Sequence, residues 1–228
     1  MAKIISGMFA CFLAGGCALG LSAIEVQAHE RTPHGVLMGE SETSEPAESA
    51  YRPPDPTTLG GAWDLVDHTG AAVTDETYRG RWMLVFFGFA GCREACPGAL
   101  STMQQALDSM GEDADRIQPL FVDFSMEEPD YLGLKQFVSN FHPRLVGLTG
   151  DRKQTFTVVR KFKVRRDYAA SNFSTKETGP RINHTTYLYV IDPDGKTRGY
   201  FSDRLPAEEY VKELRYHMTR YDKDRHGG

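Results

Sequence analysis

Two cysteines separated by three residues are the part of this chain best suited to chemistry. Cys92 and Cys96 lie in the sequence FFGFAGCREACP, which occupies residues 86–97. The apolar, aromatic residues before them, from Trp82 to Phe87, predict a buried β-strand that ends in a glycine-bearing turn. Pro97 predicts the first turn of a helix, where its missing N–H costs nothing. We therefore expect both thiols at or just before a helix N-terminus.

The predicted helix runs from Pro97 to about Met110 and ends at Gly111. Its buried face is predicted to consist of Leu100, Met103, Leu107 and Met110. The helix dipole and the free N–H groups at a helix N-terminus favour a thiolate over a thiol. Thiolate is the form that attacks disulfides and the form that binds soft metal ions. The pattern thus indicates a redox site or a metal site.

The spacing of the two cysteines separates these chemistries further. Thiol exchange in thioredoxin-like proteins commonly uses a Cys-x-x-Cys pair, whereas the three intervening residues here widen the loop and let both sulfur atoms point at one external atom. Two thiolates and one imidazole make a soft, low-coordinate site that suits copper(I). The alternative is a structural disulfide, which would stabilise the fold weakly because so short a loop removes little chain entropy.

Residues 1–28 have the features of a targeting segment. Lys3 supplies a positive charge, Ile4 to Ile24 is apolar, and the sequence VQA at residues 26–28 offers a cleavage site. A cleaved signal peptide, an uncleaved membrane anchor and a lipoprotein signal ending at Cys17 are the three interpretations, since Ile4 to Ile24 is just long enough to span a bilayer. All three predict export to an oxidising compartment, in the periplasm or facing it from the inner membrane.

The remaining chain is expected to hold one domain. Cys11 and Cys17 belong to the targeting segment, so the domain has only the 92/96 pair of cysteines. Residues 29–58 are rich in Glu, Ser, Pro and Thr and predict a flexible linker, in which His29, His34 and Met38 are better explained by solvation than by metal binding. We expect the domain at 59–219 and a frayed C-terminal tail at 220–228, with His217, Met218 and His226 at or near this end.

The net charge of the chain is −5 and its sequence has no basic stripe, which disfavours nucleic acid as a partner.

Strands and helices are predicted to alternate through this domain. Periodicity and turn residues predict an N-terminal hairpin (62–66 and 71–73), strands at 117–124 and 145–148, and helices at 129–141 and from Asp151 to 161. They also predict a hairpin (186–191 and 196–201) around the DPDG turn and a last helix from Pro206 that buries Tyr210, Val211 and Leu214. This order indicates an α/β sandwich with a mixed central sheet flanked by helices. A thiol loop between a core strand and the following helix is the thioredoxin-like arrangement. We therefore expect a thioredoxin-like fold to which the N-terminal hairpin and an inserted hairpin are added.

Two further side chains are candidates for the site. His184 precedes the strand that starts near Thr185, and in this fold the end of that strand lies beside the thiol loop. The long polar stretch before it, residues 165–183, is expected to be mobile without metal and to close when His184 binds. Asp123 ends a central strand and is expected near the site by the general rule for open sheets, or else as a cap of the next segment. His142 is expected to be structural, and His68 is expected to lie in a turn.

Three segments in order resemble the Sco/SenC family. They are residues 88–97 around the cysteines, residues 141–150 (FHPRLVGLTG), and Asn183-His184 before YLYVIDPDG at 187–195. The resemblance covers roughly residues 53–216. It implies an exported or membrane-anchored thioredoxin-fold protein that binds copper and helps to assemble the binuclear copper site of cytochrome c oxidase. At matching positions, the family's copper ligands are Cys92, Cys96 and His184.

Two departures from the family pattern affect partner recognition and redox poise. Arg93-Glu94-Ala95 places opposed charges between the cysteines, and residues 123–128 (DFSMEE) keep Asp123 but not its usual basic companion.

The resemblance leads us to expect a metallochaperone rather than an enzyme. It would deliver copper to the copper-bearing subunit of cytochrome c oxidase or to another copper acceptor protein. The alternative is a thiol-disulfide reductase that acts on the acceptor's cysteines through the same two thiols. A peroxidase or redox sensor is less well supported, because Arg93 is the only nearby side chain in sequence that could activate peroxide.

Overall fold

The structure is a computed structural model that describes residues 54–92, 95–125, 128–167 and 183–226. The predicted targeting segment, nearly all of the predicted linker and most of the polar stretch before His184 lie outside these ranges, as do Arg93 and Glu94. None of the helices in the described ranges is both long and apolar enough to cross a membrane.

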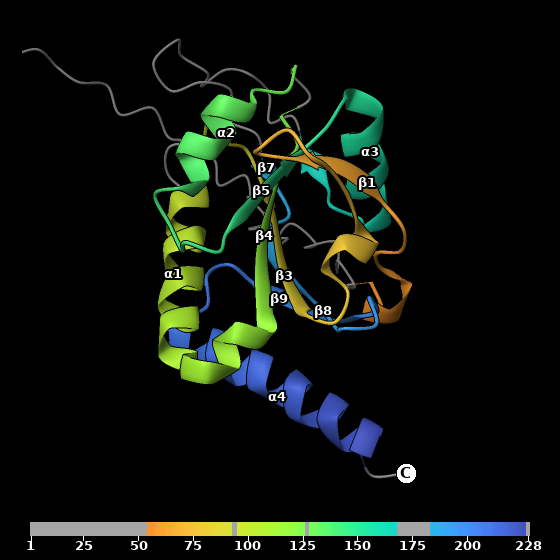
Figure 1. Ribbon diagram of the computed structural model, residues 1–228, viewed down its shortest axis with the longest axis vertical. Helices are drawn as coiled ribbons and strands as arrows, with labels where there is room; N and C mark the ends of the chain where they lie inside the picture. Colours follow the sequence, from red (N-terminus) through yellow and green to blue (C-terminus); the bar gives the residue numbers. More distant parts are fainter. Residues whose placement is uncertain (1–53, 93–94, 126–127, 168–182, 227–228) are drawn as a thin grey trace, which may run out of the picture. The chain divides into compact units, whose positions relative to one another are not determined.

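Seven strands form one mixed sheet in the order β2-β1-β5-β4-β3-β8-β9 (Figure 1). The strands are β1 (Asp64–Asp67), β2 (Ala72–Thr74), β3 (Trp82–Gly88), β4 (Ile117–Asp123), β5 (Val146–Thr149), β8 (Tyr187–Ile191) and β9 (Thr197–Ser202). The three central strands β5, β4 and β3 are parallel, and the outer pairs are antiparallel. The predicted mixed sheet is therefore confirmed, and the predicted N-terminal hairpin β1–β2 is part of it.

Helices cover both faces of this sheet. They are α1 (Ala95–Met110), α2 (Tyr131–Val138), α3 (Arg152–Lys161) and α4 (Ala207–His226). Strand β3 is buried along its whole length and divides its side chains between two cores. Leu84 and Phe86 pack with residues of α1, α2 and α4, whereas Val85 and Phe87 pack with residues of α3. Such two-sided burial explains why β3 is a continuous apolar run.

Helix α1 has the buried face that its periodicity predicts. Leu100, Met103 and Leu107 are each 1% exposed and Met110 is 3% exposed. The helix begins at Ala95, two residues before the predicted start, so Cys96 lies inside its first turn. Gly111 ends it with a φ of 60°, a conformation that glycine adopts without steric cost. The 3₁₀-helix η3 (Gly111–Arg116) then leads into β4.

The end of the predicted linker belongs to the folded domain. Residues Pro56–Thr58 form the 3₁₀-helix η1, which Asp55 caps. The hydroxyl of Thr197 in β9 donates to the carbonyl of Leu59 at 3.0 Å, and the hydroxyl of Tyr200 donates to that of Pro54 at 2.9 Å. These contacts fasten the start of the domain to edge strand β9.

The C-terminus is helical rather than frayed. Helix α4 continues to His226, and Met218 and Tyr221 are 3% and 6% exposed. The ring of Tyr221 packs edge-on against that of Trp82, with 5.4 Å between centroids. The prediction of a frayed C-terminal tail was wrong because apolar residues of α4 continue at helical spacing beyond Leu214 and pack against the sheet.

Candidate metal centre

The thiol loop is held at the carboxyl end of β3. Gly88 pairs with Asp123 across the parallel strands β3 and β4, and the N–H of Phe124 donates to the carbonyl of Gly88 at 3.1 Å. The N–H of Cys92 then donates to the carbonyl of Phe89 at 3.0 Å, which closes a tight turn. The turn leads from the end of β3 toward the N-terminus of α1, which lies next to α2 in Figure 1.

The structure brings the two thiols together without joining them. Among the described residues, Cys92 and Cys96 are the cysteines, and each carries a separate thiol rather than sharing a disulfide. Cys92 is half-buried and contacts both cores, whereas Cys96 is fully buried in the core under α1. The thiol of Cys96 donates a hydrogen bond to the sulfur of Cys92. One sulfur atom is thus accessible and the other lies beneath it.

The pKa of Cys96 is shifted upward, opposite to the expected direction. The hydrogen bond to Cys92 is the largest cause, burial is the second, and the charges of Cys92 and Asp123 add to them. A backbone hydrogen bond at Phe89 acts in the other direction but is outweighed. The helix N-terminus therefore does not make Cys96 a thiolate, because its buried thiol hydrogen-bonds to a neighbour that would lose this donor on ionisation.

Asp123 combines its two predicted roles. Its Oδ1 accepts from the backbone N–H of Ala90 at 3.4 Å and from that of Ser125 at 3.2 Å. The carboxylate thus holds the start of the thiol loop and also raises the pKa of Cys96 through its charge. The carboxylate lies close enough to Cys96 for its charge to act on the thiol, but none of the described contacts makes it a metal ligand.

The main chain of His184 lies in a separate two-stranded ladder. Strand β7 (Asn183–His184) pairs with β6 (Arg166–Asp167), with Arg166 opposite His184. Just after it, the N–H of Thr185 donates to the carbonyl of Arg165 at 3.0 Å. Strand β8 then begins beside the end of β3, where Leu188 pairs with Phe86. The backbone of His184 is therefore three residues from a strand that starts at the thiol end of the sheet.

A complete ligand set is not described by the structure. Within the described ranges, no three His, Cys, Asp or Glu side chains gather closely enough to hold a metal ion. The two thiols are two of the three predicted ligands. The predicted mobility of the segment before His184 and the charge pair between the cysteines fall outside the described residues.

Two other histidines accept backbone hydrogen bonds, which confirms the structural role predicted for His142 and gives His68 one as well. Nδ1 of His142 accepts from the N–H of Arg144 at 3.1 Å, and Nδ1 of His68 accepts from the N–H of Gly147 at 3.0 Å. Burial lowers the pKa of His142. The His68 ring thus ties its turn to β5, whereas the His142 ring stabilises its own loop before that strand.

Known proteins share this architecture and sequence pattern. Residues 52–219 match the SCO1/SenC family. The human protein "Protein SCO1 homolog, mitochondrial" is 33% identical over 167 residues, which are 72% of this chain and 54% of that protein. The chain therefore spans about half the length of this curated relative.

Solved structures agree on the fold. A structure of ScoI from Bradyrhizobium japonicum with copper bound has a TM-score of 0.61 and 31% identity, over 69% of this chain and 98% of that one. A structure of BsSco, described as a member of the Sco family of cytochrome c oxidase assembly proteins, has a TM-score of 0.55 and covers 72% of this chain and 96% of that one. At 18% identity it shows likeness of fold alone. The fold is thioredoxin-like, and the chain belongs to the SCO1/SenC family.

Proposed function

We propose that this Sco-type protein binds copper through Cys92, Cys96 and His184 and delivers it to the copper-bearing subunit of cytochrome c oxidase. The observation that carries the proposal is the hydrogen-bonded pair of thiols at the end of β3, one accessible and one buried. Sulfur ligands held this close favour a soft ion such as copper(I). Copper is here the cargo of the protein.

The asymmetry of the two thiols suits capture and release. Copper can reach Cys92 from solvent, and binding to Cys96 then displaces the proton that this buried thiol holds. The surrounding core shields the bound ion from water, while the exposed side of Cys92 leaves an approach for the thiols of an acceptor. An imidazole from His184 would complete a three-coordinate site.

The comparisons support the same proposal. The Bradyrhizobium japonicum relative is copper-bound, and BsSco belongs to a family of cytochrome c oxidase assembly proteins. The proposed location is the periplasm, or the periplasmic face of the inner membrane, and it rests on the targeting features of residues 1–28.

Copper binding to reduced and oxidised protein tests the proposal. The reduced chain is expected to bind one copper ion, and prior oxidation of Cys92 and Cys96 to a disulfide is expected to prevent binding because it removes both thiolates at once. Metal analysis after desalting measures the bound copper. Equal copper retention by the two forms would contradict the proposal.

A thiol-disulfide reductase is the second candidate, favoured by the same asymmetry. The thiolate of Cys92 would attack a partner disulfide, forming a mixed disulfide and releasing one partner thiolate. Cys96 would then lose its proton and attack the sulfur of Cys92, releasing the second partner thiolate. Two electrons pass to the partner, and the 92–96 pair becomes a disulfide.

Replacement of the histidine distinguishes the two candidates. In cells lacking the native gene, Cys92→Ser, Cys96→Ser and His184→Ala are all expected to lose oxidase assembly if copper delivery is the function. A reductase needs only the thiols. If His184→Ala supports assembly as well as wild type does while both serine variants fail, the reductase function replaces the proposed one.

A further inference from the structure

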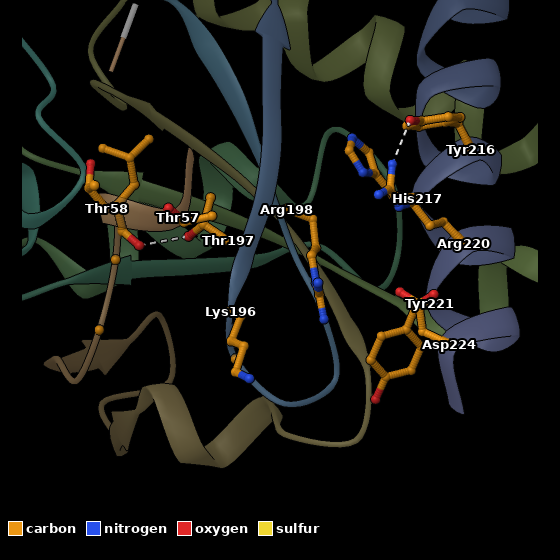
Figure 2. Close-up of a pocket in the computed structure, with 14 residues that line it drawn as sticks. Thr57, Thr58, Lys196, Thr197, Arg198, Tyr216, His217, Arg220, Tyr221 and Asp224 are labelled. Carbon is orange, nitrogen blue, oxygen red and sulfur yellow. Dashed lines mark hydrogen bonds between the residues drawn. The ribbon is translucent and has the colours of Figure 1, made fainter. Parts of the chain in front are cut away.

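A second site lies at the end of the sheet opposite the thiol loop. Ile191 at the end of β8 pairs with Met83 at the start of β3, so the turn after β8 is remote from the carboxyl end of β3. Here a cleft of about 550 Å³ opens between η1, the start of β9 and the C-terminal half of α4 (Figure 2). A cleft of this volume is large enough for a small organic ligand.

A bulge in β9 places the first cation in this cleft. Gly199 pairs with Val190 and Thr197 pairs with Ile191, which leaves Arg198 as an extra residue without a partner across the ladder. A bulge of this kind redirects a side chain. The Arg198 guanidinium lies 5.8 Å from the ring centroid of Tyr221 in α4, on the same side as the cleft.

Arg198 is oriented by a buried carboxylate. Its Nε donates to Oδ2 of Asp192 at 2.5 Å, and Oδ1 of Asp192 accepts from the N–H groups of Asp194 and Lys196 at 2.9 Å each. Within the described part of the chain, the two terminal nitrogens of Arg198 donate no hydrogen bond. They remain available to a ligand in the cleft.

Two more cations line the cleft from different elements. Lys196 comes from the turn before β9 and Arg220 comes from α4. The Lys196 ammonium has no hydrogen bond or ion pair with the described residues. Nη1 of Arg220 donates to the hydroxyl of Tyr216 at 3.2 Å, and no carboxylate among the described residues is within ion-pair distance of it. Figure 2 shows these side chains around the opening.

Cationic side chains outnumber carboxylates among the residues that line the cleft. Lys196, Arg198 and Arg220 line the cleft with one carboxylate, that of Asp224. The carboxylate of Asp192 is not part of the lining: it is fully buried and pairs with Arg198 from behind. The cleft therefore presents its guanidinium and ammonium groups, together with Asp224 at one end. Guanidinium groups and an ammonium are the side-chain groups that recognise phosphate most strongly.

We propose that this cleft binds the phosphate group of a small phosphate ester. The phosphate oxygens accept hydrogen bonds from Arg198, Lys196 and Arg220, and the attached organic group lies along the exposed ring of Tyr216. The headgroup of an anionic phospholipid carries the same phosphate chemistry. The site is independent of the copper ligands, so its test does not depend on the proposed copper function.

Calorimetric titration of the purified full chain with glycerol 3-phosphate tests the proposal, with glycerol as the comparison ligand. Binding of the phosphate ester alone is expected. Lys196→Gln and Arg220→Gln should each weaken it by about tenfold, the effect of losing one hydrogen bond to a charged group. Lys212→Gln is the matched control, because Lys212 is an exposed lysine of α4 outside the cleft that pairs with Glu209. Unchanged melting temperatures would establish that the variants fold.

Binding to lipid vesicles distinguishes the two possible sources of the phosphate group, a soluble phosphate ester and a phospholipid headgroup. Stronger binding of the wild type than of the Lys196→Gln/Arg220→Gln double variant to phosphatidylglycerol vesicles, with no such difference on phosphatidylcholine, identifies a lipid headgroup and keeps the proposal. The proposal is overturned if neither glycerol 3-phosphate nor phosphatidylglycerol vesicles bind, or if the cleft variants bind both as wild type does.

Discussion

The sulfur of Cys96 lies so close to Gly88, at the end of β3, that no residue larger than glycine fits at position 88. A Cβ atom at residue 88 would lie 2.8 Å from the sulfur of Cys96 and 2.8 Å from Cε2 of Phe121. Both distances are shorter than van der Waals contact, and both neighbours are fully buried. The absence of a side chain at residue 88 is therefore what lets the buried thiol lie directly against the strand.

Gly88→Ala is expected to displace the sulfur of Cys96 and to destabilise the protein by about 1–3 kcal/mol, the usual cost of overpacking a core. Copper affinity should fall with it, since the two sulfur atoms would no longer be held together. Urea denaturation and copper titration measure the two effects. Gly91→Ala is the matched control in the same loop, because nothing lies within 4 Å of a Cβ atom at that position. Equal stability of the two variants would contradict the packing argument.

The two thiols should differ in reactivity. Cys96 is 0% exposed and its pKa is raised, whereas Cys92 is half-buried, so iodoacetamide should modify Cys92 at least about tenfold faster. Mass spectrometry of peptides from briefly treated, reduced protein gives both rates. In urea-denatured protein the rates should become similar. Faster modification of Cys96 in the native protein would refute the assignment of the buried thiol.

Copper affinity should rise with pH through the neutral range. The raised pKa of Cys96 keeps its thiol protonated there, so a proton must leave when the thiolate binds the metal. Each released proton increases the affinity by about tenfold per pH unit. Competition titrations with a copper chelator between about pH 6 and pH 8 measure the slope. Cys96→Ser should show a shallower slope, and an equal slope in both proteins would contradict the prediction.

Asp123→Asn should lower the pKa of Cys96. The carboxylate raises this pKa by its negative charge, and asparagine keeps an oxygen that can accept from Ala90 and Ser125. The thiolate absorbance of the reduced protein should therefore develop at lower pH than in the wild type. Asp108→Asn, at an exposed carboxylate near the other end of α1, should leave the titration unchanged. A titration of Asp123→Asn that coincides with wild type would show that the charge has no effect on the thiol.

Local sequence patterns were sufficient to predict most elements of the fold. The apolar run from Trp82 to Phe87, the capping residue Asp151 and the DPDG turn each act over a few residues, and each appears in the structure where it was predicted. The ends of helices were less predictable. Helix α2 is shorter than expected at both ends, and α4 is longer, because the residues at helix ends depend on what they pack against.

The sequence alone determined that two cysteines follow a buried strand at the start of a helix, and hence that thiol or copper chemistry belongs to this loop. Only the tertiary structure decided how the two thiols differ, because burial of Cys96 depends on Gly88 and on Phe121 from the neighbouring strand. Tertiary structure also created the cationic cleft, since a bulge in β9 places Arg198 beside Tyr221 of α4, on the helix that also supplies Arg220. Contacts between residues this far apart in sequence leave no local pattern from which they could have been predicted.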